Sequence, residues 1–216
     1  MDALKLPKMP SAAPLVTLFF VGLCLAAPAS ATEPVTGSAE AGQAKSVTCS
    51  ACHGPDGNSF NPDWPSLAGQ HQQYLVKALQ SFKSGERVNA LMSGMAMSLS
   101  DADMADLAAY FGKQKRAGLT ADPALVPTGE RLYRGGNKVT GVPACLACHG
   151  PTGKGNPAAN YPAIGGQHAA YSAAQLTAYR SKQRATDGDT QMMRNVSAAL
   201  TDDEIKAVTS YIQGLR

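Results

Sequence analysis

Apolar residues recur three or four positions apart in several stretches of the chain, the spacing that places side chains on one face of an α-helix. The clearest stretch follows Ser100, a candidate N-cap, and a second follows Thr201-Asp-Asp-Glu204, which has the form of a capping box. Their apolar faces consist of Met104, Leu107, Ala108 and Phe111 in the first and Ile205, Val208, Ile212 and Leu215 in the second. Both stretches are therefore predicted to be amphipathic helices.

Weaker helical patterns precede these two stretches. The same spacing relates Tyr74, Leu75, Ala78, Leu79 and Phe82 and, in a more polar form, Tyr171, Gln175, Leu176 and Tyr179. Short helices are also expected over residues 40–48 and 128–134. No stretch alternates apolar and polar residues as a half-buried strand would, so the sequence predicts an all-α protein.

The chain contains the same pattern twice. CSACHGPDG at 49–57 matches CLACHGPTG at 145–153, WPSLAGQHQQY at 64–74 matches YPAIGGQHAAY at 161–171, and LSDADMADLAAY at 99–110 matches LTDDEIKAVTSY at 200–211. The offset between the copies grows from 96 to 97 to 101 residues, as expected for a duplicated unit with small loop insertions. We predict two tandem helical domains over residues 33–115 and 127–216, joined by a linker over 116–126 that Gly118 and Pro123 punctuate.

The N-terminus has the three parts of an export signal. Lys5 and Lys8 provide positive charge, residues 15–27 form an apolar run, and Ala29-Ser30-Ala31 fits the small-x-small pattern before a cleavage site. The run of 13 residues is short for a membrane span, so an uncleaved anchor is the less favoured alternative. Residues 1–31 are therefore predicted to be a signal peptide that contains Cys24 and is cleaved near Ala31, and the mature protein is expected to be soluble and outside the cytoplasm.

Composition adds two constraints. Aromatic residues make up only 6% of the chain, so a core built from side chains alone would be lean, and a bound apolar cofactor would complete it. The formal net charge is +3 and no block of like charges occurs, which gives no case for binding nucleic acid.

Each copy contains Cys-x-x-Cys-His, the attachment signal for c-type haem. Cysteines three residues apart lie on one side of a helical turn, where their sulfurs can add to the two vinyl groups of one haem, and the histidine that follows can ligate the iron. The motif assigns the thioether bonds to Cys49, Cys52, Cys145 and Cys148 and the proximal ligands to His53 and His149. The sequence therefore predicts two covalently bound haem c groups per chain.

A redox dithiol and a zinc site are the other common uses of a Cys-x-x-Cys pair. A thioredoxin-like dithiol would need a βαβ pattern, which the sequence lacks. Export to an oxidising compartment disfavours free thiolates held for zinc. Haem attachment is favoured because the full motif occurs at equivalent points of a duplication behind an export signal.

An electron carrier needs a sixth iron ligand that closes the coordination sphere, and methionine raises the reduction potential relative to histidine. Met92 lies eight residues before Ser100, and Met193 lies eight residues before Thr201, so the two methionines occupy the same register in the two copies. They are the predicted sixth ligands. The remaining candidates are interpreted as packing residues: Met95, Met97, Met104 and Met192.

Two histidines offer a competing ligand pair. His71 and His168 match in register and follow the proximal histidines by 18 and 19 residues, a gap that an extended segment can cover, so bis-histidine ligation stays open. Both precede a helix pattern, where a polar cap or a surface position is the ordinary role, and methionine is favoured.

A ligating histidine usually donates its other ring nitrogen to a carbonyl oxygen, which fixes the ring. Pro65 and Pro162 follow the two motifs at matched positions and have a free carbonyl oxygen but no N–H. They are candidate acceptors for His53 and His149, with turn rigidity as the alternative role.

Taken together, these motifs resemble the di-haem cytochrome c4 family. The resemblance rests on the order Cys-x-x-Cys-His, Pro-x-(Leu/Ile)-x-Gly-Gln, Met and a capped helix, twice over, and on the stretches GGQHAAY at 165–171, DGDT at 187–190 and SYIQGL at 210–215. It implies two class I cytochrome c-like domains related by a pseudo-two-fold axis. It also implies His53/Met92 and His149/Met193 as the iron ligands and the bacterial periplasm as the location.

The expected activity is one-electron transfer rather than catalysis of a reaction. The resemblance implies delivery of electrons towards a terminal oxidase or another periplasmic reductase, through transient contacts with redox proteins. The alternatives are a di-haem peroxidase, which would need one displaceable axial ligand, and a haem-based sensor, for which no signalling segment is visible. The sequence leaves peripheral association with a membrane open.

Overall fold

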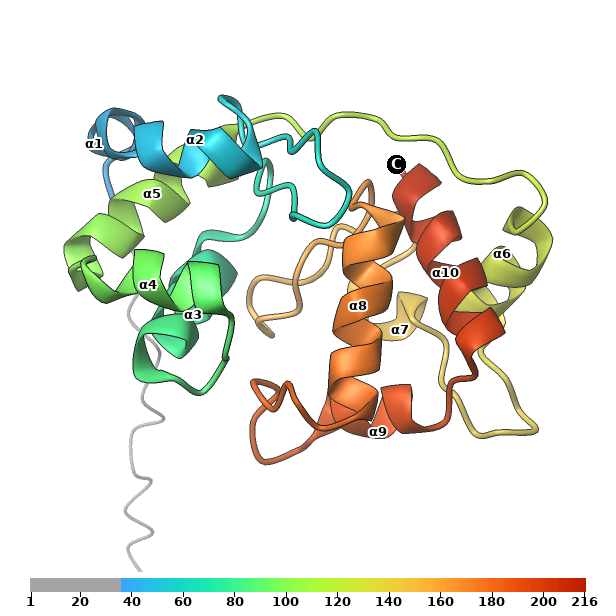
Figure 1. Ribbon diagram of the computed structural model, residues 1–216. Coiled ribbons are helices and arrows are strands. Elements are labelled where there is room, and N and C mark those ends of the chain that lie inside the picture. Colours follow the sequence, from blue (N-terminus) through green and yellow to red (C-terminus); the bar gives the residue numbers. More distant parts are fainter. Residues whose placement is uncertain (1–35) are drawn as a thin grey trace, which may run out of the picture. The chain divides into compact units, whose positions relative to one another are not determined.

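The computed structural model describes residues 36–216, and the predicted signal peptide over residues 1–31 lies outside them. Residues 36–115, the first lobe, contain α1 (Ala39–Lys45), α2 (Val47–His53), α3 (Gln72–Ser84), α4 (Ala90–Met97) and α5 (Asp101–Lys113) (Figure 1). Residues 126–216, the second lobe, contain α6 (Val126–Gly135), α7 (Leu146–His149), α8 (Ala169–Arg180), α9 (Met192–Ala198) and α10 (Asp202–Gly214). Apart from two isolated β-bridges in the second lobe, residues 36–216 form no strand, which confirms the all-α prediction.

The two lobes pack their helices in the same way. In the first lobe α5 packs against α1 and α3, and α3 packs against α4; in the second lobe α10 packs against α6 and α8, and α8 packs against α9. Each lobe has its own apolar core, one centred on Met104, Leu107 and Phe111 and the other on Tyr133, Val208 and Ile212. This repeat confirms the tandem arrangement, while the boundaries 33–115, 116–126 and 127–216 stay predictions.

The last helix of each lobe begins at a complete capping box. The Ser100 hydroxyl accepts from the backbone N–H of Asp103, whose carboxylate accepts from the backbone N–H of Ser100, and Thr201 and Glu204 make the same exchange. The apolar faces expected from the sequence are buried, with Met104 fully inaccessible. These helices therefore form where the pattern placed them.

The structure differs from the sequence analysis at two places. The helix expected over residues 40–48 is interrupted at Ser46, and a second helix, α2, continues through the first Cys-x-x-Cys-His motif. Helices α4 and α9, which carry the two candidate methionines, were not expected. The sequence of α4, ALMSGMAM, has no polar face, so apolar periodicity could not reveal it.

A glycine marks the point where the first helix of each lobe meets the last one. A Cβ atom on Gly129 of α6 would lie 2.3 Å from the carbonyl oxygen of Ala207 in α10, and a Cβ atom on Gly42 of α1 would lie 2.0 Å from the carbonyl oxygen of Asp106 in α5. Only glycine allows the backbones of these helices to approach so closely.

We expect Gly129→Ala to lower the free energy of unfolding of the second lobe by about 1–3 kcal/mol, because the added methyl group must push α6 away from α10. Denaturant unfolding followed by helical circular dichroism measures the loss. Gly135→Ala, in the same helix with open space around its Cβ, is the control and should leave the unfolding midpoint unchanged or slightly raised. Equal midpoints for Gly129→Ala and the native protein would show that the crossing tolerates a side chain.

The segment between the lobes is anchored by a half-buried arginine. Arg116 donates from Nε to the carbonyl oxygen of Ala68 in the first lobe at 2.8 Å and from its guanidinium to the carbonyl oxygen of Gly165 in the second at 3.0 Å. Burial lowers the pKa of Arg116 to about 10, which still leaves it charged at neutral pH.

Within residues 36–216, none of the helices has both the length and the apolar character that crossing a bilayer requires.

Candidate haem-binding sites

The two Cys-x-x-Cys-His motifs lie on short helices that end at their histidines. Cys49 and Cys52 are in α2, which ends at His53, and the second motif runs from Cys145, the N-cap of α7, to His149, its last residue. Gly54 and Gly150 follow with φ values of 82° and 76°, a left-handed conformation that glycine adopts without strain. The chain therefore turns away directly after each histidine.

Each of these histidines is buried and hydrogen-bonded to a proline carbonyl. His53 Nδ1 lies 2.8 Å from the carbonyl oxygen of Pro65, and His149 Nδ1 lies 3.0 Å from that of Pro162. Because a carbonyl can only accept, Nδ1 carries the proton and donates it, which leaves the lone pair on Nε2. Burial lowers the pKa of both histidines, which keeps the rings neutral, as an iron ligand must be.

The four cysteines within residues 36–216 are unbridged, and burial disfavours the thiolate of the first cysteine of each motif. Burial raises the pKa of Cys49 and raises that of Cys145 to about 11. A catalytic dithiol has a thiol of lowered pKa instead. Among residues 36–216, no three His, Cys, Asp or Glu side chains converge as a metal site would require, so the zinc interpretation also lacks its donor set.

The two candidate methionines lie near the start of equivalent helices. Met92 is in the first turn of α4, whose N-cap Asn89 accepts hydrogen bonds from the N–H groups of Leu91 and Met92. Met193 is the second residue of α9, behind a turn in which the Asp187 carboxylate pairs with Arg194 at 2.7 Å. Both methionines are half-buried. Their neighbours Met95, Met97 and Met192 are exposed.

The competing histidines are both engaged elsewhere. His71 Nε2 lies 2.8 Å from the carbonyl oxygen of Lys154 in the second lobe, and His168 Nε2 lies 2.8 Å from that of Ser59 in the first. Each Nε2 therefore donates a proton across the lobes and has no free lone pair. Both residues are N-caps of their helices by position, but neither side chain makes a capping hydrogen bond.

A polar cluster between the lobes was not anticipated from the sequence. The guanidinium of Arg87 donates to the Tyr171 hydroxyl and to Oε1 of Gln175, while that of Arg184 donates to the Tyr74 hydroxyl. Burial alone would raise the pKa of Tyr74, but the cations of Arg184 and Arg87 outweigh it and hold that pKa below its usual value. No local sequence pattern marks the contacts that these arginines make across the lobes, because those partners lie more than 80 residues away.

These features define a class of protein: two thiol pairs, each beside a buried neutral histidine with a free Nε2, are the donor set of a c-type cytochrome. The Cytochrome c family model matches residues 39–115 and 129–216. Cytochrome c4 of Pseudomonas aeruginosa is 49% identical over 93% of this chain and 96% of its own length. The thiosulfate dehydrogenase electron acceptor of Thiomonas intermedia is 41% identical over 78% of each chain.

The solved structures agree with the sequence comparison. The crystal structure of reduced cytochrome c4 from Pseudomonas stutzeri superposes with a TM-score of 0.82, at 51% identity, over 84% of this chain and all of that one. The chain belongs to the cytochrome c family and, within it, to the cytochrome c4 proteins. It is therefore an electron-transfer protein that carries two covalently bound haem c groups, in agreement with its two attachment motifs.

Proposed function

We propose that the chain works as a periplasmic carrier that passes single electrons between respiratory partners and is not itself an enzyme. In the first lobe Cys49 and Cys52 form the thioethers, and His53 and Met92 ligate the iron. In the second lobe the corresponding residues are Cys145 and Cys148 for the thioethers and His149 and Met193 for the iron.

The hydrogen bonds from His53 to Pro65 and from His149 to Pro162 are the observation that carries this assignment. They orient each ring, fix its tautomer and leave Nε2 available, which is the arrangement that metal-ligating histidines have. The proline carbonyl also makes the imidazole a stronger electron donor, so it favours the ferric state.

Methionine is the better sixth ligand because the alternatives are occupied. His71 and His168 donate from Nε2 to carbonyls of the opposite lobe, and ligation through Nε2 would require both hydrogen bonds to break, the one from His168 inside a buried contact. Met92 and Met193 retain free sulfurs at equivalent positions of α4 and α9.

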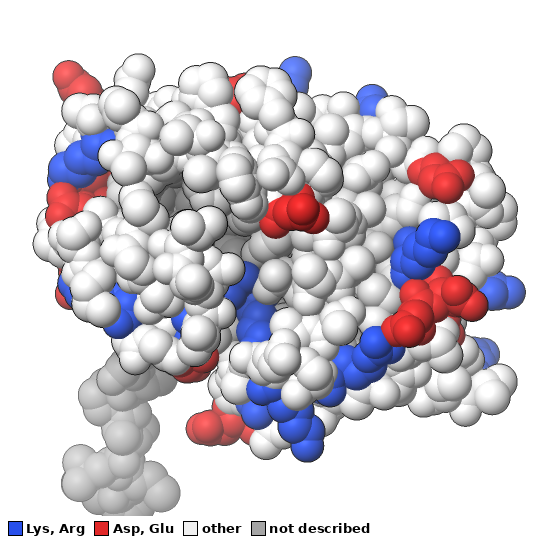
Figure 2. All heavy atoms as spheres, viewed as in Figure 1, with Lys and Arg blue, Asp and Glu red and all other residues white. Residues whose placement is uncertain are grey.

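A bound haem c supplies an iron that exchanges one electron with a partner. His53 and His149 are buried away from water. With Met92 and Met193 they would fill both ligand positions of each iron, which would leave none for a substrate. Figure 2 shows basic and acidic side chains mixed on the visible face, with uncharged surface between them. Such a surface supports transient docking through a small contact rather than binding to a highly charged polymer.

The partners and the location are proposed from the name of a relative and from the predicted signal peptide. The name of the Thiomonas intermedia relative, a thiosulfate dehydrogenase electron acceptor, supports a dehydrogenase as one source of electrons. A terminal oxidase or another periplasmic reductase would receive them, and peripheral contact with the membrane would bring the carrier to either. The predicted cleavage near Ala31 supports the periplasm.

A spectroscopic experiment separates the carrier from a di-haem peroxidase. For the carrier, we expect both ferric haems to be low-spin, with the charge-transfer absorbance of methionine-ligated iron, and the ferrous protein to bind no carbon monoxide on mixing. A peroxidase needs one open or displaceable position, so a high-spin fraction that binds carbon monoxide or reacts with peroxide would contradict the proposal.

A further inference from the structure

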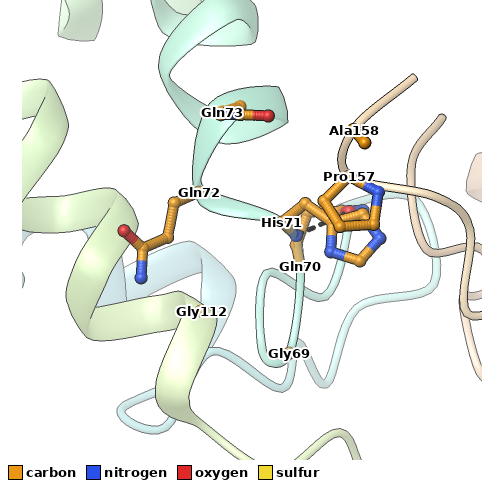
Figure 3. A pocket seen from close by; sticks show the side chains of 8 residues that line it. All are labelled: Gly69, Gln70, His71, Gln72, Gln73, Gly112, Pro157 and Ala158. Atoms are coloured by element: carbon orange, nitrogen blue, oxygen red, sulfur yellow. Dashed lines mark hydrogen bonds between the residues drawn. The ribbon is translucent and has the colours of Figure 1, made fainter. Parts of the chain in front are cut away.

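Each lobe extends a Gln-His pair into the other. Gln70 and His71 precede α3, and Gln167 and His168 precede α8, at matched positions of the duplication. Figure 3 shows Gln70 and His71 lining a pocket together with Pro157 and Ala158 of the second lobe. Both glutamines are buried, and only 6% of the surface of each residue is exposed.

Each glutamine binds one residue of the opposite lobe, and it does so with both the oxygen and the nitrogen of its side-chain amide. Gln167 accepts at Oε1 from the backbone N–H of Ser66 and donates from Nε2 to its carbonyl oxygen, both at 2.9 Å. Gln70 accepts from the N–H of Ala163 at 2.9 Å and donates to its carbonyl oxygen at 2.8 Å. The contacts are reciprocal across the lobes.

The glutamines bind Ser66 and Ala163. Each of these residues comes directly after one of the two prolines whose carbonyls accept from the candidate axial histidines. The N–H of Ser66 and the carbonyl of Pro65 belong to the same peptide unit, as do the N–H of Ala163 and the carbonyl of Pro162. A continuous series of hydrogen bonds therefore links Gln167 Oε1, the peptide 65–66 and His53 Nδ1. A second series links Gln70 Oε1, the peptide 162–163 and His149 Nδ1.

Hydrogen bonds linked in this way strengthen one another. The peptide is a resonance unit, so donating a hydrogen bond from its N–H increases the negative charge on its carbonyl oxygen. In condensed phases this polarisation strengthens the next bond by roughly 10–30%. The stronger bond makes the imidazole more basic, and a more basic ligand stabilises Fe(III) over Fe(II).

The histidines of the pairs reinforce the same region. His168 donates to the carbonyl oxygen of Ser59, whose hydroxyl donates to the carbonyl of Cys52, the residue before His53. His71 donates to the carbonyl oxygen of Lys154 in the loop after His149. The opposite lobe thus holds both the loop that follows each motif and the peptide that accepts from its histidine.

We propose that Gln167 and Gln70 are positioning residues that act across the lobes, each lowering the reduction potential of the haem in the opposite lobe. This inference rests on the proposed axial roles of His53 and His149. Without the glutamine, the proline carbonyl is a weaker and less constrained acceptor, and the opposite haem becomes easier to reduce.

The test is a redox titration of the purified di-haem protein carrying Gln167→Met, followed by NMR of the haem and axial-ligand resonances so that each haem is observed separately. At a fixed solution potential, we expect the Fe(II)/Fe(III) ratio of the first-lobe haem to rise about threefold, equivalent to about 28 mV at 59 mV per tenfold change. The second-lobe haem should keep its potential. In the reduced protein, the Nδ1–H resonance of His53 should move towards that of a weaker hydrogen bond, while that of His149 stays in place.

Two further variants complete the experiment. Gln70→Met should give the mirror result, changing the second-lobe haem alone, and provides a separate reading if one variant folds poorly. Gln213→Met is the matched control, because Gln213 also binds two backbone groups, the N–H of Ala169 at 2.8 Å and the carbonyl of Thr120 at 2.7 Å, but touches neither proline peptide. It should change neither potential.

The proposal is overturned if Gln167→Met shifts both haems equally, which would indicate a loosened contact between the lobes, or shifts the haem of its own lobe, or shifts neither. Failure of the ligand assignment looks different. In that case the native protein itself would lack the low-spin spectrum of histidine–methionine haems, whatever the glutamine variants do.

Discussion

Met193→Ala protein is expected to bind carbon monoxide at one of its two haems, and the reduction potential of that haem is expected to fall. If Met193 is the sixth ligand as proposed, removing its side chain would leave the iron of the second lobe without that ligand, and water or added carbon monoxide would take the position. Because methionine favours Fe(II) relative to oxygen or nitrogen ligands, its loss should change the Fe(II)/Fe(III) ratio at least tenfold, or about 59 mV. Absorbance spectra of the ferrous protein with and without carbon monoxide, followed by a potentiometric titration, measure both effects.

The adjacent methionine provides the control for this variant. Met192 is exposed, with 38% of its surface accessible, and lies one position out of register with the first lobe. Met192→Ala should therefore keep the native spectrum and both potentials. If Met193→Ala kept them and Met192→Ala lost them, the register argument that selects Met193 would be wrong.

The second large effect is the loss of one haem from Cys145→Ala/Cys148→Ala protein. Without either thiol the second motif cannot form thioethers, so we expect one covalent haem per chain instead of two. The second lobe should also unfold at a lower temperature than in the native protein. Cys145 packs against its apolar core, and a haem bound there would complete that core. Covalent haem is counted by mass spectrometry of the intact protein, and unfolding is followed by circular dichroism.

Cys24→Ala tests whether the loss is specific to the motif. Cys24 lies in the predicted signal peptide, outside the described residues, and its replacement should leave two haems per mature chain. A second-motif double variant that still carried two covalent haems would refute the assignment of Cys145 and Cys148.

Much of the fold could be predicted because it depends on local patterns that occur twice. The capping boxes at Ser100 and Thr201 and the apolar faces behind them determine the last helix of each lobe, and the structure contains both. Register within the duplication also selected Met92 and Met193 from among the methionines. It could not show that they lie in helices, because α4 and α9 are short and α4 has no polar side. The capping residue Asn89 was the one local signal available for α4.

The contacts between the lobes could not be predicted from the sequence. Gln167 and Ser66 are 101 residues apart, and a buried glutamine looks the same in sequence as a surface one. His71 and His168 illustrate the limit, since their matched register fitted an iron ligand as well as it fitted the hydrogen bonds that they make. Only three-dimensional placement separates these roles.

The most direct test of the whole account is a pyridine haemochrome measurement on the native protein, purified from a host that attaches haem c, after extraction of all non-covalent haem. The account predicts two haems per polypeptide, each with the spectrum of a haem bonded through two thioethers. A colourless chain, or one whose Cys-x-x-Cys pairs are recovered as disulfides, would contradict it.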